Sequence, residues 1–589
     1  MPFFFRFHYC LALICVFAIG TNVAAEGLSH DPLEVVTDLE DMGYFDSPLP
    51  LSLADGNVVA LLGNGSRGVA VWADGKVQAL EEIPNKGRYP LLKQVGQDLY
   101  GIWWRKTRPA GDKFFYISTA NQETKQFSPV VKVNREGQPL ARYGFAADGE
   151  GSAVLVYLDE RASRFHIYSA RSRDRGVSWQ QDQRMDRDEG EDGFKVIESM
   201  EPSIAHGKGR YVAVWKDRGQ SQDGKPLFRI LYSFSTNQGE TWSVPKVVMT
   251  HPELFVTDDT LFFNQGRFLY LGFLGKEIVI FQSQEGDIWE KRDSLPVPVN
   301  SSLPSYALGK TLLHVAFVGG EGKPQVYYGS YDVNTGHWAV PAKRLDIKNF
   351  DFEGYQSNTP AVVELDNGVV AAIWEDYRHL RPSIYLNYSW DGGAHWQEVS
   401  RAVDSPGKAR SVYPHVVALP DGRMEAWFSR FQSDGAPAPM RLLKKSVTFN
   451  KVEQKVVGLE PEPVYDEALR RHRLEGRVNA FWTGREQNKD EEVFNLYDPY
   501  FQARMNKHTF LGQGMSTIRY HGHHIESVKI LGDLAKARVR MTYEIDQPAL
   551  MGPEIKQPKT EQTLEMTWVW MDNEWFYRFE SQGNAILRY

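Results

Sequence analysis

One short motif, Ser-x-Asp/Asn-x-Gly-x-x-Trp, recurs three times along this chain, each time after a short β-rich run. The Asp or Asn side chain of such a turn accepts hydrogen bonds from backbone N–H groups just ahead of it, and glycine supplies the positive φ of the bend. Serine closes a second hydrogen bond, and Trp folds back to hold the turn against a sheet. The copies are Ser172, Asp174, Gly176 and Trp179; Ser235, Asn237, Gly239 and Trp242; and Ser389, Asp391, Gly393 and Trp396.

Aligning the chain on these motifs exposes a repeat of roughly fifty residues, the size of a four-stranded propeller blade. Each unit begins with a proline-containing strand, and a second strand ends in an aromatic residue followed by charged ones, as in 201–218 and 359–378. We count seven blades, with six or eight as alternatives, because sequence defines blade edges poorly. Residues 48–83 also have strand patterns and could complete the last blade, closing the ring with both chain ends.

The first 25 residues have the pattern of a secretory signal peptide, with an apolar core at 9–20 and small residues before Glu26. Both cysteines, Cys10 and Cys15, lie in this segment. The mature chain would therefore have no disulfide, thiol nucleophile or Cys-ligated metal. No later stretch is apolar enough to span a membrane. We expect an exported protein, periplasmic or extracellular.

The composition limits the classes of partner and ligand that the protein can bind. A formal net charge of −8, with mixed acidic and basic residues, argues against nucleic-acid binding. Sixteen Trp residues suit a protein that stacks on sugar rings or holds many turns. His521 and His523 could bind a metal, and the acidic loop 186–192 could bind Ca²⁺. Partly buried histidines and a solvated loop are far commoner, so we expect neither a metal nor a cofactor.

The three motifs resemble the Asp-box, or BNR, repeats of the sialidase superfamily, whose members are β-propellers. The resemblance implies a mainly β propeller for residues 26–448. In such a propeller the Asp-box turns lie on one face. The starts of the first strands and the ends of the second strands lie on the other, which we expect to be the functional face.

Sialidases grip the substrate carboxylate with arginines, attack the anomeric carbon with a Tyr that a Glu activates, and use an Asp as acid and base. The resemblance implies Tyr413 as nucleophile, Glu201 as its activator and Asp112 as acid and base. It also implies that Arg88 and Arg218 bind the substrate carboxylate. The segment 88–90 is Arg-Tyr-Pro where the family has Arg-Ile-Pro, and the third arginine is ambiguous between two candidates, Arg378 and Arg410.

Residues 449–589 differ in composition from the repeats. A helical pattern covers 466–504 with a break near Gly484, and four strand patterns follow. This part resembles the nuclear transport factor 2-like, or SnoaL-like, α+β fold, in which helices and a curved sheet enclose a cone-shaped pocket. That fold hosts many functions, so the resemblance does not identify one.

Two functions follow from these resemblances. The first is an exported sialidase-like propeller directed at carbohydrate, an exo-glycosidase that hydrolyses acidic sugars such as sialic acid. The alternative is a non-catalytic secreted or periplasmic module. Its propeller rim or C-terminal pocket would hold a glycan, another small molecule or another protein.

Overall fold

The computed structural model describes most of the chain between residues 34 and 578. The signal-peptide prediction for residues 1–25 and the predicted acid/base Asp112 lie outside this part. None of the described helices is long and apolar enough to cross a membrane. The described residues are 34–38, 49–53, 55–63, 68–74, 76–80, 87–106, 113–121, 125–161, 164–190, 192–252, 259–321, 324–346, 356–379, 381–404, 410–431, 440–459, 466–512, 518–545, 559–571 and 573–578.

Eight antiparallel sheets precede the C-terminal domain in the described residues. Seven of them have four strands in sequence order, and in the eighth both β1 and β33 pair with β32. Sheets 1 to 4 consist of β2 (Leu49–Ser52), β3 (Val58–Gly63), β4 (Gly68–Trp72) and β5 (Val77–Leu80); β6 (Gly87–Val95), β7 (Asp98–Lys106), β8 (Lys113–Asn121) and β9 (Val131–Lys132); β10 (Pro139–Ala147), β11 (Ala153–Asp159), β12 (His166–Ser172) and β13 (Gln183–Arg184); and β14 (Lys195–Gly207), β15 (Arg210–Gln220), β16 (Pro226–Ser235) and β17 (Lys246–His251).

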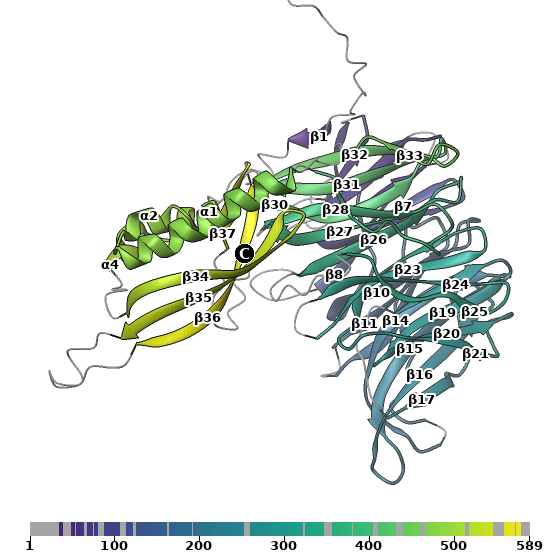
Figure 1. Ribbon diagram of the computed structural model, residues 1–589. Coiled ribbons are helices and arrows are strands. Elements are labelled where there is room, and N and C mark those ends of the chain that lie inside the picture. The colour runs from purple at the N-terminus through teal and green to yellow at the C-terminus, as the bar shows by residue number, and fades with distance from the viewer. Residues whose placement is uncertain are drawn as a thin grey trace, which may run out of the picture.

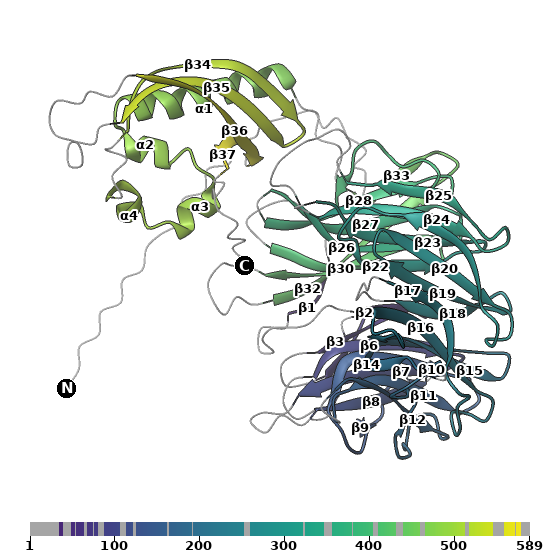
Figure 2. The same ribbon diagram turned by 90° about the horizontal axis from the view of Figure 1, so that it is seen from below.

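Sheets 5 to 8 continue the same order around the molecule (Figures 1 and 2). They consist of β18 (Thr260–Asn264), β19 (Arg267–Leu274), β20 (Glu277–Ser283) and β21 (Glu290–Pro296); β22 (Ser302–Leu308), β23 (Leu312–Gly319), β24 (Gln325–Asp332) and β25 (His337–Arg344); β26 (Ser357–Glu364), β27 (Val370–His379), β28 (Arg381–Ser389) and β29 (Arg401–Ala402); and β30 (Arg410–Ala418), β31 (Arg423–Phe431), β32 (Met440–Asn450) and β33 (Lys455–Val457), with β1 (Glu34–Asp38).

Buried apolar clusters join each sheet to the next and join sheet 8 back to sheet 1. In the closing cluster, Val36 of β1 packs with Val58 of sheet 1 and Leu442 of sheet 8. The sheets therefore form a closed ring, because sheet 8 packs against sheet 1 as the other neighbouring sheets pack against each other. This arrangement is a mainly β propeller, as expected.

The chain ends close this ring differently from the expectation. Strand β1 pairs with β32, with Glu34 opposite Lys444, and β33 pairs with the far end of the same strand. Residues 48–83 do not complete the last blade, because β2 to β5 form a sheet of their own. The expected count of seven is therefore not confirmed, and eight, one of its alternatives, matches the described sheets.

The three motif turns connect the third and fourth strands of sheets 3, 4 and 7 and have the predicted hydrogen bonds. In the first, Gly176 N donates to Ser172 Oγ at 2.8 Å and Ser178 N donates to Asp174 Oδ1 at 2.8 Å. Trp179 Nε1 donates to the Gly176 carbonyl at 3.2 Å. Trp396 Nε1 donates in the same way to the Gly393 carbonyl at 2.9 Å, whereas the buried Trp242 Nε1 of the second turn has no partner among the described residues. These turns stabilise blade geometry.

At the ends of the second strands, consecutive side chains point alternately to the junction with the preceding blade and to the junction with the following blade. Trp215 belongs to the apolar cluster shared with sheet 3, and its Nε1 donates to Asp217 Oδ1 at 3.1 Å. Lys216 points the other way, where its Nζ lies 2.5 Å from Asp259 Oδ2 of sheet 5. Because strand side chains alternate with a period of two, aromatic and acidic residues face the preceding blade and the residue between them faces the next.

The C-terminal domain contains four helices and a four-stranded antiparallel sheet. Its aromatic-rich core lies between the sheet and the helices and includes Phe481, Tyr497 and Trp568. Figures 1 and 2 show its sheet beside the ends of β27, β28 and β30. The elements are α1 (Glu467–Glu486), α2 (Asp490–Phe494), α3 (Pro499–Arg504), α4 (Lys507–Gly512), β34 (Ile518–Leu531), β35 (Leu534–Ile545), β36 (Thr560–Met571) and β37 (Glu574–Tyr577).

Candidate functional site

The innermost strands of three sheets share a bulge next to proline. Glu201 of β14, Thr359 of β26 and Tyr413 of β30 each precede a proline and have φ values of 51°, 51° and 57°. The pairing with the second strand shifts register at each of these points. Left-handed backbone is costly for residues other than glycine, and bulges re-aim side chains near functional sites. The predicted Glu201 and Tyr413 therefore occupy equivalent, specially shaped positions.

Glu201 lies in a buried polar cluster at the junction of sheets 4 and 5. Its side chain is 6% exposed, and Oε1 lies 3.6 Å from Nε of Arg142. The Tyr270 hydroxyl nearby donates to the Asp259 carboxylate, which also pairs with Lys216. Burial, Asp259 and Glu201 together raise the pKa of Tyr270 well above its usual value. Glu201 thus lies close enough to Tyr270 to affect the pKa of its hydroxyl. The neighbouring Lys216 and Asp259 already form an ion pair with each other.

Tyr413 lies beside a different glutamate. Its backbone N–H donates to Oε1 of Glu375 at 2.8 Å, and the Tyr377 hydroxyl donates to Oε2 of the same carboxylate at 3.2 Å. Glu375 is 4% exposed, and burial raises its pKa although these donors and the charge of Arg410 oppose the rise. The contact between a Tyr hydroxyl and a Glu carboxylate at this rim is therefore made by Tyr377 and Glu375.

Glu201 and Tyr413 stand on β14 and β30, half-way round the ring from each other, with three sheets between them on either side. Inner strands face the axis, so this placement leaves the predicted pair on opposite walls. The pairing of Tyr413 with Glu201 stays a prediction.

The predicted substrate-binding arginines have different surroundings. Arg378 is 8% exposed and forms a two-point ion pair with Asp376, with Nε to Oδ1 at 2.8 Å and Nη2 to Oδ2 at 2.6 Å. It also stacks over Tyr385, 3.8 Å from the ring centroid. Arg218 is paired with Glu198 across β14 and β15 at 2.8 Å, with 45% of its side chain exposed. Both guanidinium groups are engaged by carboxylates of their own sheets.

Arg410 differs from these two. It is partly exposed, stacks over Phe431 at 5.4 Å, and makes no ion pair with any residue that the structure describes. Burial raises the pKa of Glu375 and of Tyr377, and the charge of Arg410 opposes both rises, which places Arg410 in the same cluster. For Arg88, the strand position opposite Trp104 is described but the side chain is not.

Glu375 and Tyr377 were missed by the sequence reasoning, which singled out only Arg378 in that strand ending. The signal was present, since a strand period of two places 375 and 377 together on the face opposite Trp374 and Asp376. The loop 186–192 is likewise not simply solvated, because Asp186, Asp188 and Asp192 pair with arginines. No group of three or more metal-ligating side chains occurs in the described part of the chain.

Comparison with known proteins gives structural likeness only. No protein-family model and no curated protein matches the chain. A GH93 α-L-arabinofuranosidase of Fusarium graminearum is similar at 14% identity and TM-score 0.34, over 51% of this chain and 98% of that one. The NanB sialidase of Streptococcus pneumoniae is similar at 11% identity and TM-score 0.33, over 72% and 71%. A PL25 ulvan lyase is similar at 14% identity and TM-score 0.36, over 60% and 91%.

Proposed function

We propose that the protein is a carbohydrate-binding propeller that holds an acidic glycan at the rim formed by Arg410, Tyr413, Glu375 and Tyr377, here called the axial rim. The observation that carries this proposal is Arg410, a partly exposed guanidinium without an ion pair to any described residue. Guanidinium binds a carboxylate through two parallel hydrogen bonds, which suits a sugar acid. The neighbouring tyrosines offer ring faces and hydroxyl groups to the sugar ring.

Binding is favoured over sialoside hydrolysis because a three-arginine clamp would require existing ion pairs to break. Arg378 is buried with Asp376, and separating them would leave a buried charge without its partner, at a cost of roughly 3–5 kcal/mol. Arg218 would have to leave Glu198. A single arginine with aromatic neighbours is sufficient for recognition.

Isothermal titration of the full-length protein with sialylated and uronic-acid oligosaccharides, and with neutral counterparts, tests the proposal. Arg410→Gln is expected to weaken acidic-glycan binding about tenfold or more, the value of a lost charge-assisted hydrogen bond. Arg218→Gln is the matched control, a rim arginine already paired within its sheet, and should change affinity less than about twofold. Equal affinities of wild type and Arg410→Gln would refute the proposal.

A glycosidase is the second candidate, and the hydrogen bond from Tyr377 to Glu375 favours it. A Tyr hydroxyl next to a carboxylate base can attack an anomeric carbon, with the carboxylate accepting the hydroxyl proton. As the Tyr O–C bond forms, the glycosidic C–O bond breaks and the departing oxygen takes a proton from an acid, the role predicted for Asp112. Turnover of fluorogenic sialosides and arabinosides by wild type would support this candidate. Loss of that turnover in Tyr377→Phe would assign the role to Tyr377. Loss in Tyr413→Phe with retention in Tyr377→Phe would favour the sequence-predicted Tyr413 and Glu201.

Export and the C-terminal fold are further parts of the proposal. N-terminal sequencing of the secreted or periplasmic protein should begin at Glu26, whereas a cytoplasmic chain that retains residues 1–25 would contradict export. The helices packed on a four-stranded sheet support a nuclear transport factor 2-like domain. Its interior is filled by aromatic side chains such as Phe481, Phe501 and Trp568, which favours a structural or partner-binding role over catalysis.

A further inference from the structure

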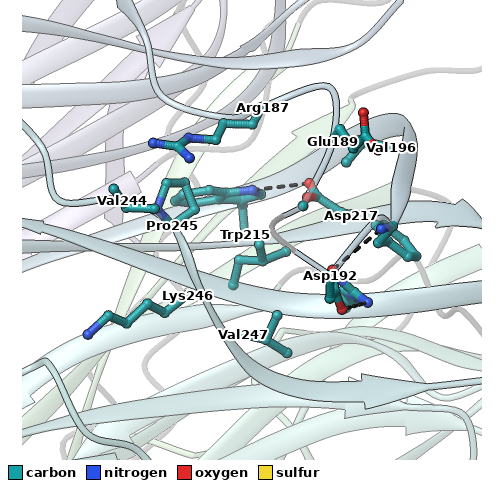
Figure 3. Close-up of a pocket in the computed structure, with 14 residues that line it drawn as sticks. Arg187, Glu189, Asp192, Val196, Trp215, Asp217, Val244, Pro245, Lys246 and Val247 are labelled. Atoms are coloured by element: carbon teal, nitrogen blue, oxygen red, sulfur yellow. Dashed lines mark hydrogen bonds and ion pairs between the residues drawn. The ribbon is translucent and has the colours of Figure 1, made fainter. Parts of the chain in front are cut away.

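A cavity of about 230 Å³ lies in sheet 4, beneath the connection 185–194 that leads there from sheet 3 (Figure 3). Its walls include Trp215 and Asp217 of β15, Arg229 of β16 and Val247 of β17. Drug-sized ligands occupy pockets of about 300–1,000 Å³, so this smaller cavity suits a single ring. It belongs to a different sheet from the axial rim.

Two side chains on the cavity wall, Arg229 and Asp217, each have one polar atom without a hydrogen-bond partner among the described residues. Arg229 is 8% exposed, and its Nη1 donates to Asp192 Oδ1 at 2.9 Å, but its buried Nε has no hydrogen-bond acceptor. Asp217 is 3% exposed, and Oδ1 accepts from Ser199 Oγ at 2.6 Å and from the Trp215 indole. Its Oδ2 accepts no hydrogen bond from a described residue and is therefore open to a donor. Buried polar atoms normally have partners, so the Arg229 Nε–H is a donor that the described residues leave unsatisfied.

Apolar surface surrounds these two groups. Trp215 and Phe194 form the inner wall, and Arg229 stacks over the Phe194 ring at 3.8 Å. Val244 and Val247 are 41% and 44% exposed beside the opening. Trp215 and Phe194 are each 1% exposed, so the apolar surface that a ligand can touch is that of the two valines. Apolar surface beside a few directed polar groups is the arrangement that receives the C–H groups and the hydroxyls of a sugar.

The charges of the cavity favour a neutral ligand. The guanidinium of Arg229 is already neutralised by the two-point contact with Asp192. Burial raises the pKa of Asp217 to about 7, so its carboxyl is partly ionised at neutral pH and would then repel an anion. At the mouth, Arg187 and Lys246 face one carboxylate, that of Glu189. With Arg229, Asp192 and the partly ionised Asp217 included, the positive charges of the lining exceed the negative ones by no more than one, which is a weak attraction for a carboxylate or phosphate.

We infer that this cavity binds one neutral sugar ring, with one hydroxyl accepting from Arg229 Nε and an adjacent hydroxyl donating to Asp217 Oδ2. The ring's C–H face lies against Val244 and Val247, the exposed apolar residues of the lining. This inference goes beyond the proposed function, because it concerns a second site in another sheet and does not depend on Arg410. The two sites together would let the protein hold an acidic residue and a neutral residue of glycans.

Isothermal titration or saturation-transfer NMR of the full-length protein at pH 7, with glucose, galactose, mannose, arabinose and xylose, tests this inference. Glucuronate serves as the charged comparison. Val247→Trp fills the cavity from a partly exposed position and should abolish binding of the neutral sugar. Val177→Trp is the matched control, a 63% exposed valine in the motif turn of sheet 3, and should bind as wild type does.

Arg229→Lys supplies an independent reading, since lysine can keep the ion pair with Asp192 but has no Nε–H. It should weaken neutral-sugar binding about fivefold or more while its thermal midpoint stays near that of Val177→Trp. Arg410→Gln should leave this binding unchanged. The inference is overturned if no sugar of the panel binds, if glucuronate binds as tightly as the best neutral sugar, if Val247→Trp binds like wild type, or if Arg410→Gln abolishes binding.

Discussion

Replacing Asp217 by asparagine is expected to change the pH dependence of stability, because this carboxyl is buried without a cation bound to it. Burial raises its pKa from an ordinary value near 3.8 to about 7, with the charge of Asp186 contributing and the Ser199 and Trp215 hydrogen bonds opposing. One pKa unit corresponds to about 1.4 kcal/mol, so a rise of about three units corresponds to at most about 4 kcal/mol in the free energy of unfolding.

The direction follows from proton binding. Between about pH 4 and pH 7 the folded protein holds a proton on Asp217 that the unfolded chain has released. The contribution of this group to the free energy of unfolding is therefore greatest below pH 4, falls as pH rises through this window, and stays low above pH 7. Asparagine keeps an acceptor for the Trp215 indole and does not titrate. Asp217→Asn should then be more stable than wild type at pH 8, by up to about 4 kcal/mol, with less than half of that advantage left at pH 5.

Urea denaturation followed by Trp fluorescence at pH 5, 6, 7 and 8 measures this difference, and the groups common to both proteins cancel. Asp376→Asn is the control, because the equivalent aspartate of sheet 7 is paired with Arg378. That variant should lose roughly 3–5 kcal/mol at pH 5 as well as at pH 8, since the buried guanidinium loses its partner. A stability difference between Asp217→Asn and wild type that stays constant from pH 5 to pH 8 would refute the reasoning.

Three further outcomes are expected from thermal and urea denaturation. Gly393→Ala should lower the free energy of unfolding by about 1–3 kcal/mol more than Gly422→Ala does. Both glycines have positive φ, but a Cβ at 393 would overlap the Tyr328 hydroxyl whereas a Cβ at 422 would meet open space, so equal losses of stability would contradict this packing. Val36→Asp should lower the free energy of unfolding by about 2 kcal/mol or more, since Val36 is 6% exposed where β1 closes the ring, and an unchanged midpoint would argue against closure by β1. Ser172→Ala should cost about 1–3 kcal/mol because Gly176 N loses its acceptor, with glycan binding at the axial rim unaffected.

The sequence predicted the repeat and its turns well, because those features are local. The hydrogen bonds of the turn at Ser172 and Asp174 involve residues only a few positions apart, so one short pattern specifies them. The C-terminal helices and strands were also predictable from periodicity. The number of sheets was not, since it depends on whether the segment at 49–80 forms its own sheet or completes another.

The candidate site was predicted less completely. Tyr413 and Glu201 have positive φ values at bulges, and their predicted catalytic roles stay a prediction. Their partners were not predictable, because each is supplied by a strand of the neighbouring sheet. Arg378 illustrates the difficulty, since its sequence position suggests a ligand contact but Asp376 and Tyr385 bury its guanidinium.

The chain's own pattern determined that it forms repeated four-stranded units with hydrogen-bonded turns, because period-two alternation and glycine at positive φ act over a few residues. Tertiary structure alone decided how many units close the ring, that β1 joins β32, and which charges remain available at the rim. Ring closure brings together residues hundreds of positions apart, such as those of β1 and β32. Whether an arginine forms an ion pair or stays open to a ligand depends on neighbours that no local pattern specifies. Arg410 depends on the packing of sheet 8 against sheet 7, and the cavity at Asp217 depends on how the connection from sheet 3 packs on sheet 4.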